Sequence, residues 1–216
     1  MKVITFTDED DFIKKTTHVI FRICKETPNC NIALSGGSTP KPVYDILEKK
    51  LTKDECKRIH FYQVDERYVP ADHPDSNQKM IKETLIKNHG IKFTHFDTSI
   101  PIKKSLAKYA KSLPKIIDLT ILGIGPDGHI ASLFPHCEAL NSKDTVAHTQ
   151  TDEFAINHRL TLTLPTILKS KNILVLIKGQ DKKSVLETLK QGKKSIAEFP
   201  AVALLKNKNL LIHYLK

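Results

Sequence analysis

The stretch Ile121–Pro135, ILGIGPDGHIASLFP, decides the predicted fold. It begins inside an apolar run, residues 116–122, that has the length of a strand buried on both faces and that stops at Gly123. Two further glycines, a proline and an aspartate then predict a tight turn, which delivers His129 to the carboxyl end of that strand. Open α/β sheets bind their ligands at this edge, so we predict that His129 is the reactive group.

Two other interpretations of this stretch exist. Its three glycines spell GxGxxG after a strand, which is the pattern of a dinucleotide-binding turn. Such a turn feeds a long helix, whereas here only HIASLF precedes Pro135, and Pro126 lies inside the turn. No acidic residue ends a second strand about 20 residues further on, because Asp144 belongs to a polar stretch, so a nucleotide cofactor is disfavoured. The other interpretation, that His129 is only a structural capping residue, stays open.

Length and composition predict one globular domain over residues 1–216. The chain has 216 residues, 40% of them hydrophobic, and no stretch resembles a linker. The start MKVITFTDEDDF has no targeting pattern and no apolar run reaches the ~20 residues of a membrane span, so we expect a soluble cytoplasmic protein without a membrane partner. The four cysteines form no CxxC pair, which indicates neither a disulfide framework nor a zinc site.

The positive charge is spread along the chain. The net charge is +10, but the lysines occur as scattered pairs without interleaved aromatic residues, so we expect a solvated surface and no specific nucleic-acid partner. Only four residues are arginines, and two of them, Arg67 and Arg159, lie beside motifs. The planar guanidinium makes two-pronged contacts with anions that lysine cannot make.

An anion site is predicted after the second strand. Strand-like residues 3–6, a helix from Asp8 to about Lys25 and a strand NIALS at 31–35 come first, and GGSTPKPVYDILEKKL follows. We expect Thr39 to cap a helix that has Pro40 in its first position and runs to about Leu51. Glycines next to a helix N-terminus let backbone N–H groups approach an anion, and phosphate is the natural one. An ordinary turn rich in glycine is the alternative.

Charged residues end the next strand. The strand RIHFYQV at 58–64 leads into Asp65, Glu66 and Arg67, again in the expected ligand crevice. In an extended segment Asp65 and Arg67 share a face and Glu66 points the opposite way. A salt-bridged strand end is the alternative. A helix is expected to follow around Met80, and His73 has no ligand spacing to other histidines, so no metal site is predicted.

The remainder of the chain predicts four further strands and one helix. They are a short strand near residue 146, an alternating strand at 159–165, a buried strand at 173–177 and a final strand at 210–214, with a helix at 180–192 before the last. Lys182 falls in the first turn of that helix, where a cation opposes the helix dipole. This placement hints at an anionic ligand, and a solvated lysine is the alternative.

Four segments together resemble the 6-phosphogluconolactonase family. They are SGGSTP at 35–40, VDERYVPADHPDSN at 64–77, GIGPDGHIASLFP at 123–135, and RLTLT at 159–163 with GQDK at 179–182. The resemblance implies a doubly wound, Rossmann-like α/β fold with a mostly parallel sheet and helices on both faces. It also implies hydrolysis of the small-molecule lactone 6-phospho-D-glucono-1,5-lactone without metal or organic cofactor.

The resemblance also assigns roles to residues. His129 would be the general base that activates water, Asp65 and Arg67 would line the sugar side, and the phosphate would be held by the group Gly36, Gly37, Ser38, Thr39, Arg159 and Lys182. Two segments depart from the family pattern: TQTDEFAINH at 149–158, which lacks the expected prolines and basic residue, and the C-terminal LLIHYLK. The first departure puts the shape of the phosphate-side wall in doubt.

Two other functions remain open on the sequence. One is an amino-sugar phosphate deaminase or sugar-phosphate isomerase on the same fold, and the other is a non-catalytic binder. A deaminase of this fold carries a glutamate shortly after its DGH motif, whereas residues 130–135 contain no carboxylate. Asp65 remains, but a single carboxylate beside one histidine suits water activation at a carbonyl better than enolisation, so lactone hydrolysis is favoured. We expect a monomer or a small homo-oligomer.

Overall fold

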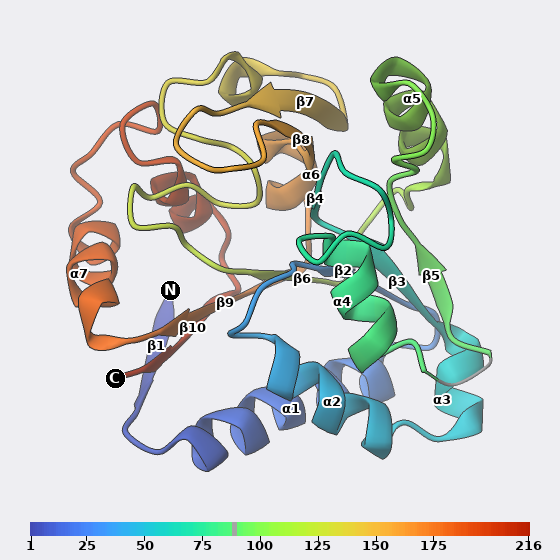
Figure 1. Cartoon of the computed structure of the whole chain (residues 1–216). Helices are drawn as coiled ribbons and strands as arrows, with labels where there is room; N and C mark the ends of the chain where they lie inside the picture. Colours follow the sequence, from blue (N-terminus) through green and yellow to red (C-terminus); the bar gives the residue numbers. More distant parts are fainter. Residues whose placement is uncertain (88–89) are drawn as a thin grey trace.

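A seven-stranded sheet forms the centre of the structure, a computed structural model that describes residues 1–87 and 90–216 (Figure 1). Its strand order is β1-β10-β9-β6-β2-β3-β5, and every neighbouring pair is parallel. The strands are β1 Lys2–Phe6, β2 Cys30–Leu34, β3 Ile59–Gln63, β5 Lys92–Thr94, β6 Leu119–Leu122, β9 Asn172–Lys178 and β10 Leu210–Leu215. The predicted doubly wound α/β class is confirmed.

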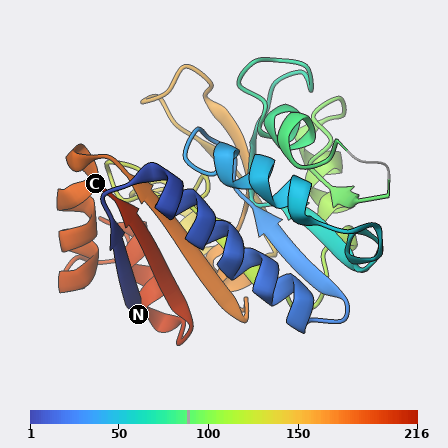
Figure 2. The ribbon, with the colours of Figure 1, turned by 90° about the horizontal axis from the view of Figure 1, so that it is seen from below.

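Helices cover both faces of this sheet. One face packs against α1 Glu9–Glu26, α2 Lys41–Lys50, α3 Lys53–Arg58 and α4 Asn77–Thr84, and Figure 2 shows α1 lying across it. The other face packs against α5 Ile102–Ser112, α6 Leu164–Leu168 and α7 Lys183–Gln191. Strand β9 feeds both cores, because Leu174 and Leu176 point to the first and Val175 to the second. This explains why its sequence is a continuous apolar run.

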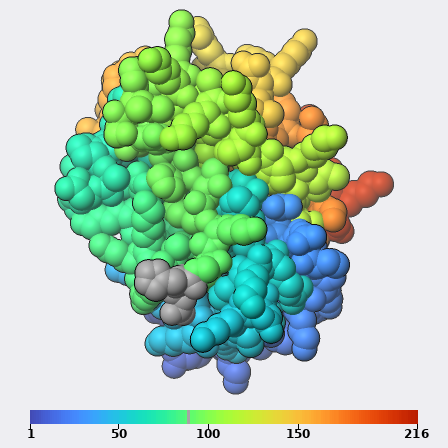
Figure 3. Space-filling view, turned by 90° about the vertical axis from the view of Figure 1, so that its right-hand side faces the viewer, coloured from blue at the N-terminus to red at the C-terminus, as the bar shows by residue number. Residues whose placement is uncertain are grey.

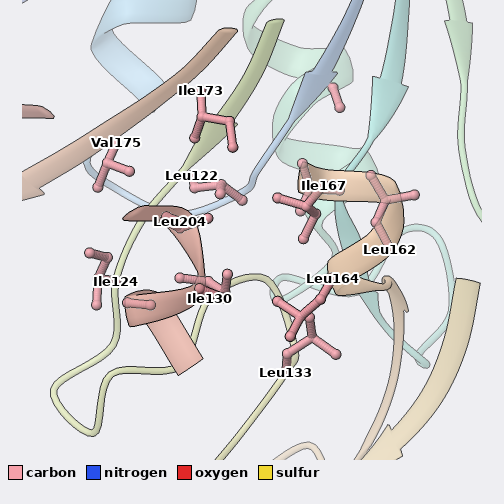
Figure 4. Close-up of a cluster of buried hydrophobic side chains, with 14 of the residues drawn as sticks. Leu122, Ile124, Ile130, Leu133, Leu162, Leu164, Ile167, Ile173, Val175 and Leu204 are labelled. Carbon is pink, nitrogen blue, oxygen red and sulfur yellow. The ribbon is translucent and has the colours of Figure 1, made fainter. Parts of the chain in front are cut away.

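A second, smaller sheet lies above the carboxyl edge of the main one (Figure 1). It contains β4 Asp65–Arg67, β8 His158–Leu162 and β7 Val146–Gln150 in the order β4-β8-β7, all antiparallel. Buried side chains from β6, β8, β9 and α6 fill the space between the sheets, as Figure 4 shows. Ile130 and Leu133, which flank the turn that carries His129, point into this cluster and have no exposed surface.

The helix starts test the capping predictions. Asp8 caps α1 as expected, because its Oδ1 accepts a hydrogen bond from the backbone N–H of Asp11 at 2.7 Å. The predicted Thr39 cap is wrong. The chain already turns at 38–40, so the position before α2 falls on Pro40, which has helical dihedrals and no side-chain acceptor.

Several elements differ from the predictions or were not predicted. The helix expected at 180–192 consists of a 3₁₀ turn η2 Gln180–Lys182 followed by α7, and two more 3₁₀ turns are η1 Glu138–Asn141 and η3 Pro200–Lys206. Helices α3 and α5 were missed, although Thr52 and Glu55 form a capping box at the start of α3. Figure 3 shows the face on which the surface of α5 lies above that of α3. Within the described ranges, every helix is too short or too polar to cross a bilayer.

Candidate active site

The predicted site lies where the strand order reverses. From β2 the chain proceeds to β3 on one side, and from β6 it proceeds to β9 on the other, so a crevice opens between the carboxyl ends of β2 and β6. A pocket of about 190 Å³ occupies this position. It is lined by Ser35, Gly36, Asp65, Arg67, Asn77, Gly123, Ile124, Gly125, His129 and Ala131. A larger pocket of about 420 Å³, between η1, α6 and η3, contains none of the predicted site residues.

His129 is held by a carboxylate within its own turn. The Oδ1 of Asp127 lies 2.6 Å from the Nδ1 of His129 and also accepts the backbone N–H of His129 at 3.1 Å. A carboxylate accepts hydrogen bonds, so this contact places the imidazole hydrogen on Nδ1 and leaves the lone pair on Nε2. Nε2 has no protein partner among the described residues, and the ring lines the pocket. The geometry therefore fits a general base whose ring is oriented by a carboxylate at Nδ1 and whose Nε2 is available to a ligand.

The pKa of Asp127 is lowered, which suits its role beside the base. Burial by itself raises the pKa of Asp127, but the hydrogen bonds from the His129 side chain and backbone outweigh it, so the pKa lies below its ordinary value. Its second oxygen, Oδ2, is buried without a hydrogen-bond partner in the described chain. The pair therefore favours an ionised carboxylate beside the imidazole, which stabilises a proton taken up by that ring.

The turn around this pair tolerates only glycine at two positions. An added Cβ at Gly125 would collide with the His129 ring and would lie 2.6 Å from Asp127 Oδ1. Gly128 has a left-handed φ of 87°, and an added Cβ there would collide with the Phe199 ring. The backbone N–H of Ala201 also donates to the Gly128 carbonyl at 2.9 Å. The glycines therefore serve histidine placement rather than nucleotide binding.

Asp65 and Arg67 share the pocket, as predicted. They lie on the same face of β4, opposite Thr161 and Arg159 of β8. Asp65 Oδ2 accepts a hydrogen bond from the Ser132 hydroxyl at 2.7 Å, and Nη1 of Arg67 donates to the Asp75 carbonyl at 2.7 Å. These two residues form no ion pair with each other in the described structure, so the alternative of a salt-bridged strand end is not supported.

Glu66 points away from the pocket, as the alternation of the strand predicted. Its side chain is fully buried and accepts five hydrogen bonds, from Gln63 Nε2, Ser76 Oγ and the backbone N–H groups of Arg67, Asn77 and Gln78. Burial raises the pKa of Glu66, while these donors act in the opposite direction. Glu66 thus joins β4 to the N-terminus of α4.

The residues assigned to phosphate are only partly brought together. Gly36 lines the pocket, where an added Cβ would collide with Oδ1 of Asn77. Gly37 and Ser38 are exposed, Thr39 is half-buried, and these three continue the loop outside the pocket lining. No backbone N–H group of residues 36–39 has a hydrogen-bond partner within the described structure, as an anion site requires.

Arg159 and Lys182 also lie outside the pocket lining. Arg159 is buried beside Arg67 on the neighbouring strand; its Nε donates to the Ile156 carbonyl at 2.9 Å. Burial, followed by the charge of Arg67, lowers its pKa. Lys182 is half-buried at the carboxyl edge of the main sheet, at the end of η2, and its side chain contacts no predicted site residue through a hydrogen bond or ion pair.

Three residues of the site were not predicted from the sequence. Ser35 and Asn77 lie inside quoted motifs, and their positions beside a strand end and a helix start were the available signals. Asp127 was missed as the partner of His129, although it precedes the histidine by two residues in a tight turn. A carboxylate therefore does support this histidine, but it is the aspartate of the DGH motif itself rather than a residue after the motif. No group of three or more potential metal-ligating side chains occurs in 1–87 and 90–216.

Comparison with known proteins identifies the family. The family model described as glucosamine-6-phosphate isomerases/6-phosphogluconolactonase matches residues 8–212. The chain belongs to this family. It is 34% identical over 219 residues to the probable 6-phosphogluconolactonase of Dictyostelium discoideum, covering 95% of this chain and 92% of that protein.

Solved structures of known proteins share this fold. The 6-phosphogluconolactonase of Thermotoga maritima superposes with a TM-score of 0.85 and 31% identity, covering 99% of this chain and 98% of that one. A monomeric glucosamine-6-phosphate deaminase superposes with a TM-score of 0.86 at 24% identity, covering 100% of this chain and 98% of that one. The fold alone thus does not distinguish a lactonase from a deaminase. The distinction depends on the residues of the site.

Proposed function

We propose that this protein hydrolyses 6-phospho-D-glucono-1,5-lactone to 6-phosphogluconate, the second step of the oxidative pentose phosphate pathway. The observation that carries the proposal is the 2.6 Å contact between Asp127 Oδ1 and His129 Nδ1 in the pocket at the strand reversal. Relatives in several organisms named 6-phosphogluconolactonase support the choice of substrate.

The chemistry needs one base used twice. Nε2 of His129 takes a proton from water as the water oxygen forms a bond to the lactone carbonyl carbon. Asp127 stabilises the imidazolium that results. The tetrahedral intermediate then breaks its bond to the ring oxygen, which receives the proton from Nε2, and the product is the open-chain acid. Arg67, whose buried Nε has no partner in the described structure, lines the pocket and is our choice to stabilise the oxyanion.

The remaining polar residues would position the substrate. Asp65, held by Ser132, would accept hydrogen bonds from sugar hydroxyl groups. The loop Gly36–Thr39 would receive the phosphate on its unpaired N–H groups, with Arg159 and Lys182 as cationic partners. We propose that the reaction needs no metal or organic cofactor and takes place in the cytoplasm, in a monomer or small homo-oligomer.

The direct test is acid release from freshly prepared lactone, measured in a pH-stat above the spontaneous rate. We expect wild type to accelerate it, His129→Ala to lose nearly all of the acceleration while staying folded, and His18→Ala, a substitution of an exposed histidine on α1, to match wild type. A fully active His129→Ala variant would refute the assignment.

A second candidate is deamination of glucosamine 6-phosphate. The histidine–carboxylate pair favours it, because ring opening by a deaminase also uses a histidine supported by a carboxylate. Enolisation needs a separate base for the carbon acid, and Asp65 is the pocket carboxylate available for that. Ammonia release from glucosamine 6-phosphate at a rate comparable with lactone hydrolysis would favour this candidate, whereas none is expected.

A further inference from the structure

The loop between β7 and β8 places an exposed aromatic ring against the proposed site. Phe154 keeps 38% of its surface exposed, and it belongs to the segment 149–158 that departs from the family pattern. Its ring centroid lies 5.6 Å from that of His129, with the planes at 82°, and 5.8 Å from that of Phe134. The guanidinium of Arg159 lies 5.6 Å from the same ring. One side chain therefore contacts the proposed base and a proposed phosphate ligand, which come from distant segments.

The orientation of His129 depends on three neighbours. Asp127 fixes the direction of Nδ1 through a hydrogen bond. The ring can still rotate about this bond, so the tilt of its plane is set by the side chains that pack against it. Phe134 packs against the imidazole at 4.9 Å between centroids, and Phe154 adds an edge-on contact from another side. The exposed ring is thus the outer member of a cluster of three aromatic rings that includes the base itself.

Arg159 is buried and lies next to a like charge. It is opposite Arg67 in the strand register, and burial and this neighbour both disfavour its charge, while the carboxylates of Asp65, Glu66 and Asp75 favour it. The loop also stabilises the guanidinium in two ways, through the Ile156 carbonyl that accepts from Nε and through the face of Phe154. The loop itself is closed by hydrogen bonds, from Asn157 Nδ2 to Asp152 Oδ1 at 2.6 Å and between the backbones of Thr151 and Asn157 at 3.2 Å.

We propose that Phe154 is a positioning residue, which holds the plane of His129 and the guanidinium of Arg159 through one ring and covers both from water on the loop side. The proposal rests on the proposed function for its kinetic test. It assigns a task to the segment 149–158, where the prolines and basic residue of the family pattern are absent: here an aromatic ring and a backbone carbonyl hold the arginine.

The kinetic test compares three variants of Phe154. Phe154→Ala is expected to lower kcat/KM about tenfold or more, because it removes both contacts. Phe154→Leu keeps an apolar cover but no π face, so we expect mainly a raised KM for the phosphorylated lactone. Phe154→Tyr keeps the ring and should stay within about threefold of wild type. With glucono-1,5-lactone, which has no phosphate for Arg159 to bind, the loss in Phe154→Leu should disappear.

The control is Ile116→Ala, which truncates another exposed hydrophobic side chain away from the pocket and should match wild type. Thermal midpoints of all variants establish that they are folded. The proposal is overturned when folded Phe154→Ala keeps its kcat/KM within twofold of wild type, or when Phe154→Tyr is as slow as Phe154→Ala.

A second measurement does not need activity. The rate of carbethoxylation of His129 by diethyl pyrocarbonate, followed by mass spectrometry of the peptide that contains it, reports how exposed the imidazole is in the free protein. We expect it to rise at least threefold in Phe154→Ala and to stay near wild type in Phe154→Tyr. Equal rates in all three proteins would overturn the positioning role. When wild type has no lactonase activity, the proposed function fails and this comparison still decides the role of Phe154.

Discussion

Gly125 is the residue on which the placement of His129 depends most directly. An added methyl group would occupy the space of the imidazole and press on Asp127. Since displacement of a catalytic group by about 1 Å costs about 100-fold, we expect Gly125→Ala to lose at least this factor in kcat while remaining folded. The measurement is the initial rate of lactone hydrolysis together with a thermal melt.

Gly123→Ala is the matched control for an added methyl group in the same turn. The closest atom to its Cβ would be the Leu176 carbonyl oxygen at 4.0 Å, so the His129–Asp127 contact should persist. We expect its kcat to change far less than that of Gly125→Ala. Similar losses in both variants would show that the steric argument is wrong.

Arg159 tests the phosphate assignment at the same scale. Lysine has no equivalent of the Nε donor that binds the Ile156 carbonyl and no planar group for the face of Phe154. Because the phosphate is remote from the bond that breaks, Arg159→Lys should raise KM about tenfold or more and change kcat by less than about threefold.

The control for this substitution is Arg58→Lys. Arg58 donates to the Thr27 carbonyl at the opposite edge of the sheet, so its replacement should not alter KM. Kinetics of Arg159→Lys identical to those of wild type, or a loss confined to kcat, would contradict the phosphate assignment.

At the scale of elements, Glu66 joins β4 to α4. Its Oε1 accepts the backbone N–H groups of Arg67 and Asn77, so one carboxylate sets the position of two residues that line the pocket. Glu66→Gln puts an amide donor against backbone or side-chain donors. We expect a loss of about 3 kcal/mol in the free energy of unfolding, measured with urea, and a slower enzyme.

Glu83→Gln provides the comparison on the same helix. Glu83 is exposed near the end of α4, so this substitution should change the free energy of unfolding by less than about 0.5 kcal/mol. Unfolding of Glu66→Gln at the same urea concentration as wild type would show that the buried network does not hold the helix.

The elements that could be predicted from the sequence are those with a strong local pattern. The apolar run of β9 and the Asp8 cap of α1 are of this kind, and both were confirmed. The small sheet could not be predicted, because β4 has three residues and pairs with β8 across about 90 positions of the sequence, which only tertiary packing determines.

Within the site, the alternation of β4 correctly separated Asp65 and Arg67 from Glu66. The contact between Asp127 and His129 depends on turn dihedrals, including the left-handed Gly128, that a motif does not reveal. Phe154 was beyond prediction for another reason: its loop is placed by contacts with residues from other segments.

At the scale of the whole molecule, His213 makes stability depend on pH. It is buried between the rings of Phe6 and Phe12, with Nδ1 2.8 Å from the Thr16 hydroxyl and Nε2 unpaired in the described structure. Burial, with a smaller contribution from Lys2, lowers its pKa to about 4. Below about pH 6.5 the unfolded chain therefore takes up a proton here that the folded protein refuses until about pH 4.

We predict that stability falls as the pH decreases through this window, by on the order of 3 kcal/mol from this residue. The measurement is urea unfolding of wild type and His213→Gln between pH 7.5 and pH 4.5. The variant should lack this component, so the two curves of stability against pH should converge at low pH. Parallel curves would contradict the assignment. A single transition would also support our proposal that residues 1–216 form one domain.

The main sheet can form completely only after β10 has been synthesised. This strand lies between β1 and β9, and its residue Leu211 is the partner of Lys2. On the ribosome β1 therefore emerges long before β10, the strand to which it binds, whereas β9 precedes β10 by only one helix and two 3₁₀ turns and its edge is open for a much shorter time. Strand β1 is thus synthesised long before it can be paired, and chaperones that shield unpaired strands would act on it in that interval.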